Sequence, residues 1–285
     1  MIKLDKVTKL IGTFYLRNIS FEIPEGYIIG LIGANGCGKT SLLHILAGLY
    51  KTDEGEMELL GMKYPENEEK LHDQIGVVLQ ERLYEDYMTL EENANYYGRF
   101  YSNYEEALFK EKLKAYDLDP RRTYKGLSKG EELKFQFAFA LAHHPKLLLL
   151  DEPTGNFDID FRAEFHRALK DFLSDGEHTI ILATHLTEDL EQIADYIIYM
   201  EDGRILTAMD IEELRSKYRI VAGEEYRMKL LPEQRVIHME KGEFSTKALI
   251  RHRVIDTYDT SYTVSIPTIE EFMYFVTKRA KGIDL

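Results

Sequence analysis

Residues 33–41 read GANGCGKTS, a glycine-rich stretch that fits the pattern G-x-x-x-x-G-K-[ST] of phosphate-binding loops. An apolar segment of strand length, YIIGLI at 27–32, precedes it, and a helix is expected from Lys39 to about Leu49. In such a loop the backbone N–H groups close around phosphates, the lysine reaches the β and γ phosphates, and the next hydroxyl ligates Mg²⁺. The stretch therefore predicts a strand–loop–helix unit that binds a nucleotide.

This loop supplies most of the candidate nucleotide-binding residues. They are Gly33, Asn35, Gly36, Cys37, Gly38, Lys39, Thr40 and Ser41. Thr40 is also a candidate ligand of Mg²⁺. Two interpretations of Cys37 stay open: the position needs only a small side chain, or its thiol has a lowered pKa at the start of a helix and is open to oxidation.

The composition is that of a globular protein without a broad basic surface. The chain has 285 residues, of which 44% are hydrophobic and 30% charged, and its net charge is −14. This charge argues against charge-driven binding to nucleic acid, so we expect no nucleic-acid partner. One cysteine allows no intramolecular disulfide. Without a signal peptide or an apolar run near the roughly 20 residues that span a bilayer, the expected location is cytoplasmic.

The order of predicted elements indicates an α/β fold. GVVLQ (76–80) and LLLLD (147–151) have the continuous apolar character of strands in parallel sheets. Between them, residues 81–144 become helical, with a capping box at Thr89 and Glu92. We therefore predict a phosphate-loop NTPase core with a parallel or mixed sheet and an inserted helical subdomain.

The C-terminal region is predicted to be a small α+β appendage. A final helix is expected at Thr268, capped with Glu271. The segments expected to be short strands before it are EYRMKLL (225–231), QRVIHM (234–239), STKALI (245–250) and SYTVSI (261–266).

Polar residues follow three of the predicted core strands, where ligands bind in open α/β sheets. Asp151, which ends LLLLD, is a candidate Mg²⁺ ligand, and Glu152 is placed to orient or deprotonate a water aimed at the γ-phosphate. Gln80 is a candidate for contact with the metal or the attacking water, and His185 for a hydrogen bond to the γ-phosphate. For each of these last two, a solvated loop residue is the alternative.

A second anion site is predicted at LSKGEE, residues 127–132. The stretch stands just before a strongly helical run, and a helix start offers free backbone N–H groups and a partial positive charge. The Ser128 hydroxyl and the N–H groups near Gly130 are the candidate contacts with this anion.

Taken in order, these motifs resemble the nucleotide-binding subunit of an ATP-binding-cassette (ABC) transporter. The matching run is GANGCGKT, Gln80, LSKGE, LLLLDEP, GNFD at 155–158, and His185. The resemblance covers about residues 1–215, which it identifies as an ABC ATPase domain, and leaves 216–285 as an accessory region. LSKGE is the motif that separates this family from other phosphate-loop NTPases.

The resemblance implies how the two phosphate sites work together. In the family's head-to-tail dimers, ATP lies between the phosphate loop of one chain and the Ser128–Gly130 segment of the other, with Asp158 and His185 at the same interface. The implied cofactors are ATP and Mg²⁺. The implied partners are a second nucleotide-binding subunit, identical or different, and a separate transmembrane permease that is gripped through residues 81–144 and holds the chain on the inner face of the membrane.

Single-cassette chains with such a tail look similar to bacterial exporters of drug, peptide or lantibiotic cargo. The alternatives are a non-transport ATPase acting on ribosomes or DNA, and a nucleotide-binding switch with little hydrolysis.

The chain departs from the family pattern at two places. Lys129 and Glu131 replace the glycine and glutamine of the usual LSGGQ, and Lys129 is expected either to face phosphate or to point to solvent. The aromatic residue that stacks on adenine falls at Ile11, with Phe14 or Tyr15 as substitutes.

Overall fold

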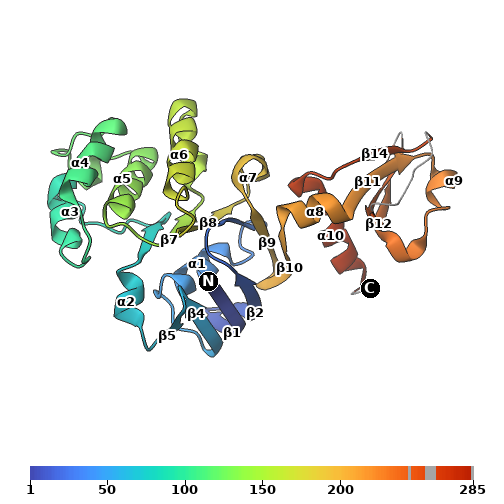
Figure 1. The fold of residues 1–285 in the computed structure, drawn as a ribbon, viewed down its shortest axis with the longest axis horizontal. Helices are drawn as coiled ribbons and strands as arrows, with labels where there is room; N and C mark the ends of the chain where they lie inside the picture. The colour runs from blue at the N-terminus through green and yellow to red at the C-terminus, as the bar shows by residue number, and fades with distance from the viewer. Residues whose placement is uncertain (243–244, 254–260, 284–285) are drawn as a thin grey trace. The chain divides into compact units, whose positions relative to one another are not determined.

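The computed structural model describes residues 1–242, 245–253 and 261–283, which Figure 1 shows as coloured ribbons. The chain divides into two compact units. The first unit holds Met1–His185 and Met200–Ile205, and the second holds Leu186–Tyr199 and Leu206–Leu285. No helix among the described residues is long and apolar enough to cross a membrane.

Four parallel strands of a six-stranded sheet form the core of the first unit. In spatial order they are β3 (Ile28–Ile32), β8 (Thr179–Thr184), β7 (Leu147–Asp151) and β6 (Ile75–Val78). Every residue of β3, β7 and β8 is buried, which explains their unbroken apolar sequences. Because the strands are parallel, their carboxyl ends share one edge of the sheet, and the predicted site residues follow these ends. The predicted α/β class is confirmed.

Helices and a second sheet complete this unit. The antiparallel sheet has the order β2-β1-β4-β5, and neither β4 nor β5 was predicted from the sequence. The bounds are β1 Ile2–Ile11, β2 Phe14–Ile23, β4 Glu54–Leu59, β5 Met62–Tyr64, α1 Lys39–Leu46, α2 Glu68–His72 and α6 Ile159–Phe172. The helix α1 starts at Lys39 as predicted and ends three residues earlier than expected.

The predicted helical insertion contains α3 (Leu90–Gly98), α4 (Glu106–Ala115) and α5 (Lys129–Ala142), grouped together in Figure 1. The capping box at the start of α3 is confirmed: Thr89 Oγ1 accepts from Glu92 N at 3.1 Å, and Thr89 N donates to Glu92 Oε2 at 2.8 Å. Aromatic rings fill the space between the helices, as where Tyr84 packs edge-on against Phe135 with ring centroids 4.8 Å apart.

The second unit contains an antiparallel sheet of order β12-β13-β11-β14. Its strands are β11 (Tyr218–Gly223), β12 (Val236–Lys241), β13 (Thr246–Arg251) and β14 (Thr263–Ser265). The helices are α7 (Thr187–Ile193), α8 (Ile211–Lys217), α9 (Glu225–Met228) and α10 (Ile269–Ile283). The strands β9 (Tyr196–Glu201) and β10 (Arg204–Asp210) are joined by a turn at Asp202 and Gly203, and the stretch Met200–Ile205 of this hairpin belongs to the first unit.

One predicted strand of this unit is wrong. The segment 225–231 begins with the helix α9, because its apolar side chains are spaced for a helix and not for alternation. Met228 is fully buried against Val221, Ala248 and Ile250, and Leu231, three residues on, packs against the same cluster. The predicted start of α10 is confirmed, since Thr268 and Glu271 exchange backbone-to-side-chain hydrogen bonds of 3.1 Å each.

Candidate active site

The phosphate loop of residues 33–38 is shaped by glycines and closed by Lys39. Gly36 and Gly38 have φ angles of 81° and 110°, which side chains rarely adopt. A Cβ at Gly38 would also lie 2.9 Å from Cζ of Phe14. The Lys39 side chain is buried, and its Nζ donates to the carbonyl oxygens of Gly33 at 2.8 Å and Ala34 at 3.4 Å. The loop therefore holds its lysine in place before any phosphate binds.

A cavity of about 380 Å³ opens over this loop. Ile11 and Phe14 both line it, so each of these two candidates for contact with adenine borders the nucleotide pocket, whereas Tyr15 is not among the lining residues. The remaining lining residues are Asn35, Gly36, Gly38, Lys39, Thr40, Ser41 and Glu152. Most of the predicted loop residues are thus gathered around one space.

Cys37 lies in the loop but does not line this cavity. Its side chain is 4% exposed, and its backbone N–H donates to the Ala34 carbonyl at 3.2 Å. Burial raises the pKa of the Cys37 thiol and outweighs the opposing charge of Lys39. The interpretation of a reactive thiol with a lowered pKa is therefore wrong. The structure agrees with the other interpretation, in which the position holds a small side chain.

The next feature is Asp151, a buried carboxylate at the end of β7. Its Oδ2 accepts a hydrogen bond from Thr40 Oγ1 at 2.7 Å, while its Oδ1 is buried without a hydrogen-bond partner. Burial raises the pKa of Asp151. A carboxylate and a hydroxyl beside a phosphate site fit Mg²⁺, which takes few protein oxygens and completes its shell with phosphates and water. The described residues contain no group of three or more His, Cys, Asp or Glu side chains that could hold a metal.

Glu152 lies between His185 and Lys39. Its Oε2 lies 2.8 Å from His185 Nδ1, and its Oε1 lies 3.5 Å from Lys39 Nζ. The residue has left-handed backbone angles, φ 46° and ψ 45°, while its N–H donates to the Ala183 carbonyl at 2.8 Å. Such strained conformations persist only where surrounding bonds enforce them, and they cluster at functional sites. The strained turn presents the carboxylate to the cavity.

Gln80 reaches the same two acidic residues through their backbone. Its Nε2 donates to the carbonyl oxygens of Asp151 at 3.1 Å and Glu152 at 3.0 Å. The prediction gave Gln80 a metal or an attacking water as its partner. In this structure the amide nitrogen of Gln80 ties the end of the β6 segment to the acidic turn, and its contact with metal or water stays a prediction.

At the start of α5, Lys129 does not simply point to solvent. Its Nζ donates to the Gln80 carbonyl oxygen and lies 3.4 Å from Glu132 Oε2. That it faces a phosphate stays a prediction. Ser128 caps the helix, with its Oγ accepting from Glu131 N at 3.3 Å. Gly130 is packed so closely that a Cβ would lie 2.6 Å from the Asn156 carbonyl oxygen.

Glu131 is held by an arginine. It forms an ion pair with Arg122, whose Nη2 lies 3.3 Å from Glu131 Oε2, and it accepts from Ser128 N at 2.8 Å. These contacts lower the pKa of Glu131 to about 2, the bond from Arg122 having the largest effect. A glutamate here thus completes a capping box and an ion pair within its own chain.

Two residues that were not predicted from the sequence belong to the same arrangement. Glu132 and Gln136 are buried on the face of α5 that also carries Lys129, at positions i+3 and i+7 from it. Gln136 binds Leu79 through both backbone groups, at 2.8 and 3.1 Å, and Glu132 pairs with Arg82. The sequence signal that could have revealed them is the spacing of polar residues along one face of the helix. Glu132 and Gln136 together fix the chain on either side of Gln80.

Asp158 begins the helix α6 and is 64% exposed as a side chain. Its carboxylate accepts from Phe161 N at 2.8 Å and pairs with Lys134 of α5 at 3.3 Å. The pKa of Asp158 is lowered, first by the backbone hydrogen bond. The residue therefore links the turn after Glu152 to the second predicted anion site.

Comparisons with known proteins agree with this geometry. A family model described as ABC transporter matches residues 16–155. The chain is 30% identical to the ABC transporter ATP-binding protein NatA of Bacillus subtilis, over 72% of this chain and 85% of that one. It is 28% identical to the bacitracin transport ATP-binding protein BcrA of Enterococcus faecalis, over 77% and 72%. It is 35% identical to the sulfate/thiosulfate import ATP-binding protein CysA of Bacillus cereus, over 72% and 60%.

A solved structure is similar as well. It is a dimeric, post-hydrolysis state of an ATP-binding cassette bound to ADP and Pi, with a TM-score of 0.66 and 27% identity over 74% of this chain and 99% of that one.

Proposed function

Because this chain belongs to the ABC transporter family, as an ATP-binding subunit with ATPase activity, we propose that it powers transport by closing and releasing a cassette dimer around ATP. The observation that carries the proposal is the position of Glu152 beside the phosphate loop, held by His185 on one side and Lys39 on the other. The loop residues lining the cavity bind the phosphates, and the Glu152 carboxylate accepts a proton from the attacking water.

Each residue of the site has its own role in the proposed hydrolysis. Lys39 is already oriented by two carbonyl oxygens, so it meets the β and γ phosphates at little entropic cost. His185 holds Glu152 and is placed to bind the γ-phosphate once the site closes. Thr40, Asp151 and Gln80 would hold Mg²⁺, which supplies charge stabilisation to the phosphates when bound.

The second anion site completes the proposal. Ser128 and Gly130 lie at the start of α5, and Asp158 at the start of α6, on segments that touch through Gly130 and Asn156. We assign Ser128 and Gly130 to the γ-phosphate of a partner chain's ATP, and Asp158 to the same interface. The dimeric relative bound to ADP and Pi supports a dimeric working state.

The proposed partner in the membrane is a separate permease bound through residues 81–144. Exposed aromatic side chains on this subdomain support the assignment: Tyr87 is 80% exposed, Phe100 68% and Tyr96 41%. Tyr84, by contrast, is committed to ring packing inside the subdomain. We accordingly propose that the chain lies on the cytoplasmic face of the membrane, with residues 1–215 as the ATPase domain and 216–285 as an accessory region.

We propose export of a drug- or peptide-like cargo, supported by the similarity to the bacitracin transport protein BcrA. The similarity to the import protein CysA makes import the competing direction. ATP-driven uptake of bacitracin into inside-out membrane vesicles that contain the chain and its permease would support export. Uptake of the cargo only into right-side-out vesicles would establish import.

The dimer proposal is tested by light scattering on Glu152→Gln. This variant keeps the loop that binds ATP but removes the general base, so it should accumulate as an ATP-bound dimer. A shift in mass from monomer to dimer on adding ATP is expected. A variant that binds ATP in calorimetry and stays monomeric would refute closure between two identical chains.

A further inference from the structure

Lys129 makes contacts that the glycine usual at this position of the family's signature cannot make. It is the first residue of α5, and its Nζ donates to the Gln80 carbonyl oxygen and lies 3.4 Å from Glu132 Oε2. Its side chain is 33% exposed, so much of its stem is packed against the protein. The lysine therefore adds a cationic link between the start of α5 and the segment that follows β6.

A buried carboxylate keeps this ammonium group in place. Glu132 is 3% exposed, and its two oxygens are divided between Lys129 and Arg82. Arg82 is held in turn by Asp86 at 2.6 Å. Removing one partner of a buried ion pair is costly, because it leaves the other charge without compensation. The position of Lys129 Nζ is thus set by the packing of α5, as part of a charged cluster.

Gln80 joins this cluster to the turn that carries the proposed general base. Its carbonyl oxygen accepts from Lys129, while its Nε2 donates to the carbonyl oxygens of Asp151 at 3.1 Å and Glu152 at 3.0 Å. Glu152 has left-handed backbone angles, which persist only where surrounding bonds enforce them. The bonds from Gln80 therefore help to hold the Glu152 carboxylate beside the phosphate loop.

The residues on either side of Gln80 have anchors of their own. Leu79 is bound by Gln136 through both backbone groups, and Glu81 Oε2 lies 3.1 Å from His44 Nε2 of α1. Lys129 acts on the Gln80 carbonyl itself. Its removal should therefore free the orientation of Gln80 without detaching the stretch.

We propose that Lys129 is a positioning residue for ATP hydrolysis. By fixing the backbone of Gln80, its ammonium group sets the direction of the Gln80 amide and, through it, the place of Glu152. In this role Lys129 acts through Gln80 and touches no reacting atom. The inference rests on the proposed function, because it needs Glu152 to act on the attacking water.

The test compares Lys129→Met with the wild-type chain in steady-state ATP hydrolysis. Methionine keeps the apolar stem and removes the charge. We expect kcat to fall about tenfold, because displacing a catalytic group costs rate steeply, while KM for ATP stays within about twofold. Lys129→Arg, which keeps a cationic donor, should retain most of the wild-type kcat. An unchanged kcat in Lys129→Met, or a loss that appears only in KM, would overturn the proposal.

A double-mutant cycle separates this role from a general loss of stability. In the Gln80→Ala chain the carbonyl remains, but the amide that reaches the acidic turn is gone. Adding Lys129→Met there should lower kcat by less than about twofold, because the two substitutions interrupt the same path. A further loss as large as in the wild-type background would show that Lys129 acts elsewhere.

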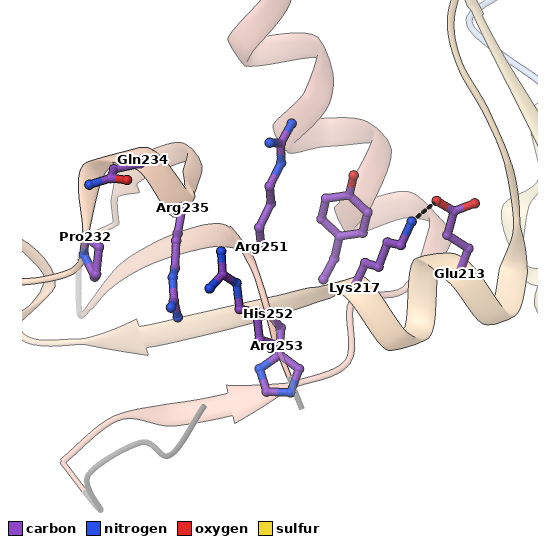
Figure 2. Close-up of a pocket in the computed structure, with 9 residues that line it drawn as sticks. Glu213, Lys217, Pro232, Gln234, Arg235, Arg251, His252 and Arg253 are labelled. Carbon is purple, nitrogen blue, oxygen red and sulfur yellow. Dashed lines mark hydrogen bonds and ion pairs between the residues drawn. The ribbon is translucent and has the colours of Figure 1, made fainter. Parts of the chain in front are cut away.

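A matched control removes a lysine that is paired on a helix of the second unit. Lys217 of α8 lies 2.5 Å from Glu213, as the dashed line in Figure 2 shows. Lys217→Met removes the same charge and an ion pair within one helix, and should leave kcat within about twofold. Equal losses in the two methionine variants would contradict a role specific to position 129.

A contact between Lys129 and the partner chain's ATP is the competing role, and it predicts a different result. Light scattering with ATP on Glu152→Gln and on the same chain with Lys129→Met distinguishes the two. If Lys129 positions Gln80, the ATP-dependent dimer still forms, because closure does not need the lysine. Loss of the dimer on adding Lys129→Met would overturn the positioning role.

The two proposals fail separately. Near wild-type turnover by Glu152→Gln, or no hydrolysis by the wild-type chain, would overturn the role of Glu152 and that of Lys129 with it. A wild-type chain that hydrolyses ATP and loses nothing on Lys129→Met would overturn the role of Lys129 alone.

Discussion

Replacing Glu131 by glutamine removes one negative charge from the first turn of α5 and keeps the shape of the side chain. Glutamine can still accept the hydrogen bond from Ser128 N, so the capping box survives. What is lost is the ion pair with Arg122. The substitution also restores the glutamine that is usual in the family's signature. Comparing this variant with the wild-type chain therefore tests the effect of Glu131 on both stability and activity.

The expected loss follows from the pKa of Glu131. The folded chain lowers this pKa from 4.5 to about 2, which corresponds to about 3 kcal/mol at about 1.4 kcal/mol for each pKa unit. The side chain is 29% exposed, and solvent screening reduces the effect, so we expect a loss of about 1–2 kcal/mol at pH 7. Because Glu131 is more acidic when folded, its stabilisation is complete above about pH 4.5 and disappears as the pH falls towards 2.

Urea unfolding of both proteins, at pH 7 and in steps towards pH 3, measures this difference. The matched control is Glu92→Gln, which removes the same charge from the same position of the capping box of α3. The pKa of Glu92 is lowered by the backbone and hydroxyl of Thr89, with no arginine involved, so a smaller loss is expected. A gap between wild type and Glu131→Gln that stays constant with pH would show that the Arg122 pair is not its source.

Three further predictions concern the phosphate sites. Gly130→Ala should lower the free energy of unfolding by about 1–3 kcal/mol, because its Cβ would press on the Asn156 carbonyl; Gly155→Ala, which meets nothing within 4 Å, should be near neutral in the same urea titration. Glu152→Gln should bind ATP but turn over about 10²- to 10⁴-fold more slowly, and near wild-type phosphate release would contradict its role as base. Cys37 should resist Ellman's reagent at pH 7.5 until urea unfolds the chain, since burial raises its pKa; rapid labelling of the folded chain would disprove this.

Features that depend on local sequence were predictable. The phosphate loop, the buried strands of the parallel sheet and the capping boxes at Thr89 and Thr268 are specified by glycine spacing, apolar runs and side chains within three residues of each other. Parallel strands then bring their carboxyl ends together, which is why the sequence alone was enough to group Asp151, Glu152 and His185.

Features set by distant partners were not predictable. The contact of Lys129 with a backbone carbonyl 49 residues away could not be predicted, because it depends on how the two segments pack. The strands β4 and β5 alternate apolar and polar residues over only about three positions each, and their places depend on the pairing of β4 with β1 and of β5 with β4.

The contacts between α5 and residues 79–82 also affect how the site unfolds locally. Lys129, Glu132 and Gln136 bind this stretch from one helix face, so the stretch cannot detach while the first two turns of α5 stay folded. In native-state hydrogen exchange, the amide of Leu79 should therefore exchange together with the amides of α5, as one cooperative opening. Because the turn of Asp151 and Glu152 is tied to Gln80, we expect fluctuations that reach this turn to begin in α5, whose Lys129 lies 49 residues after Gln80.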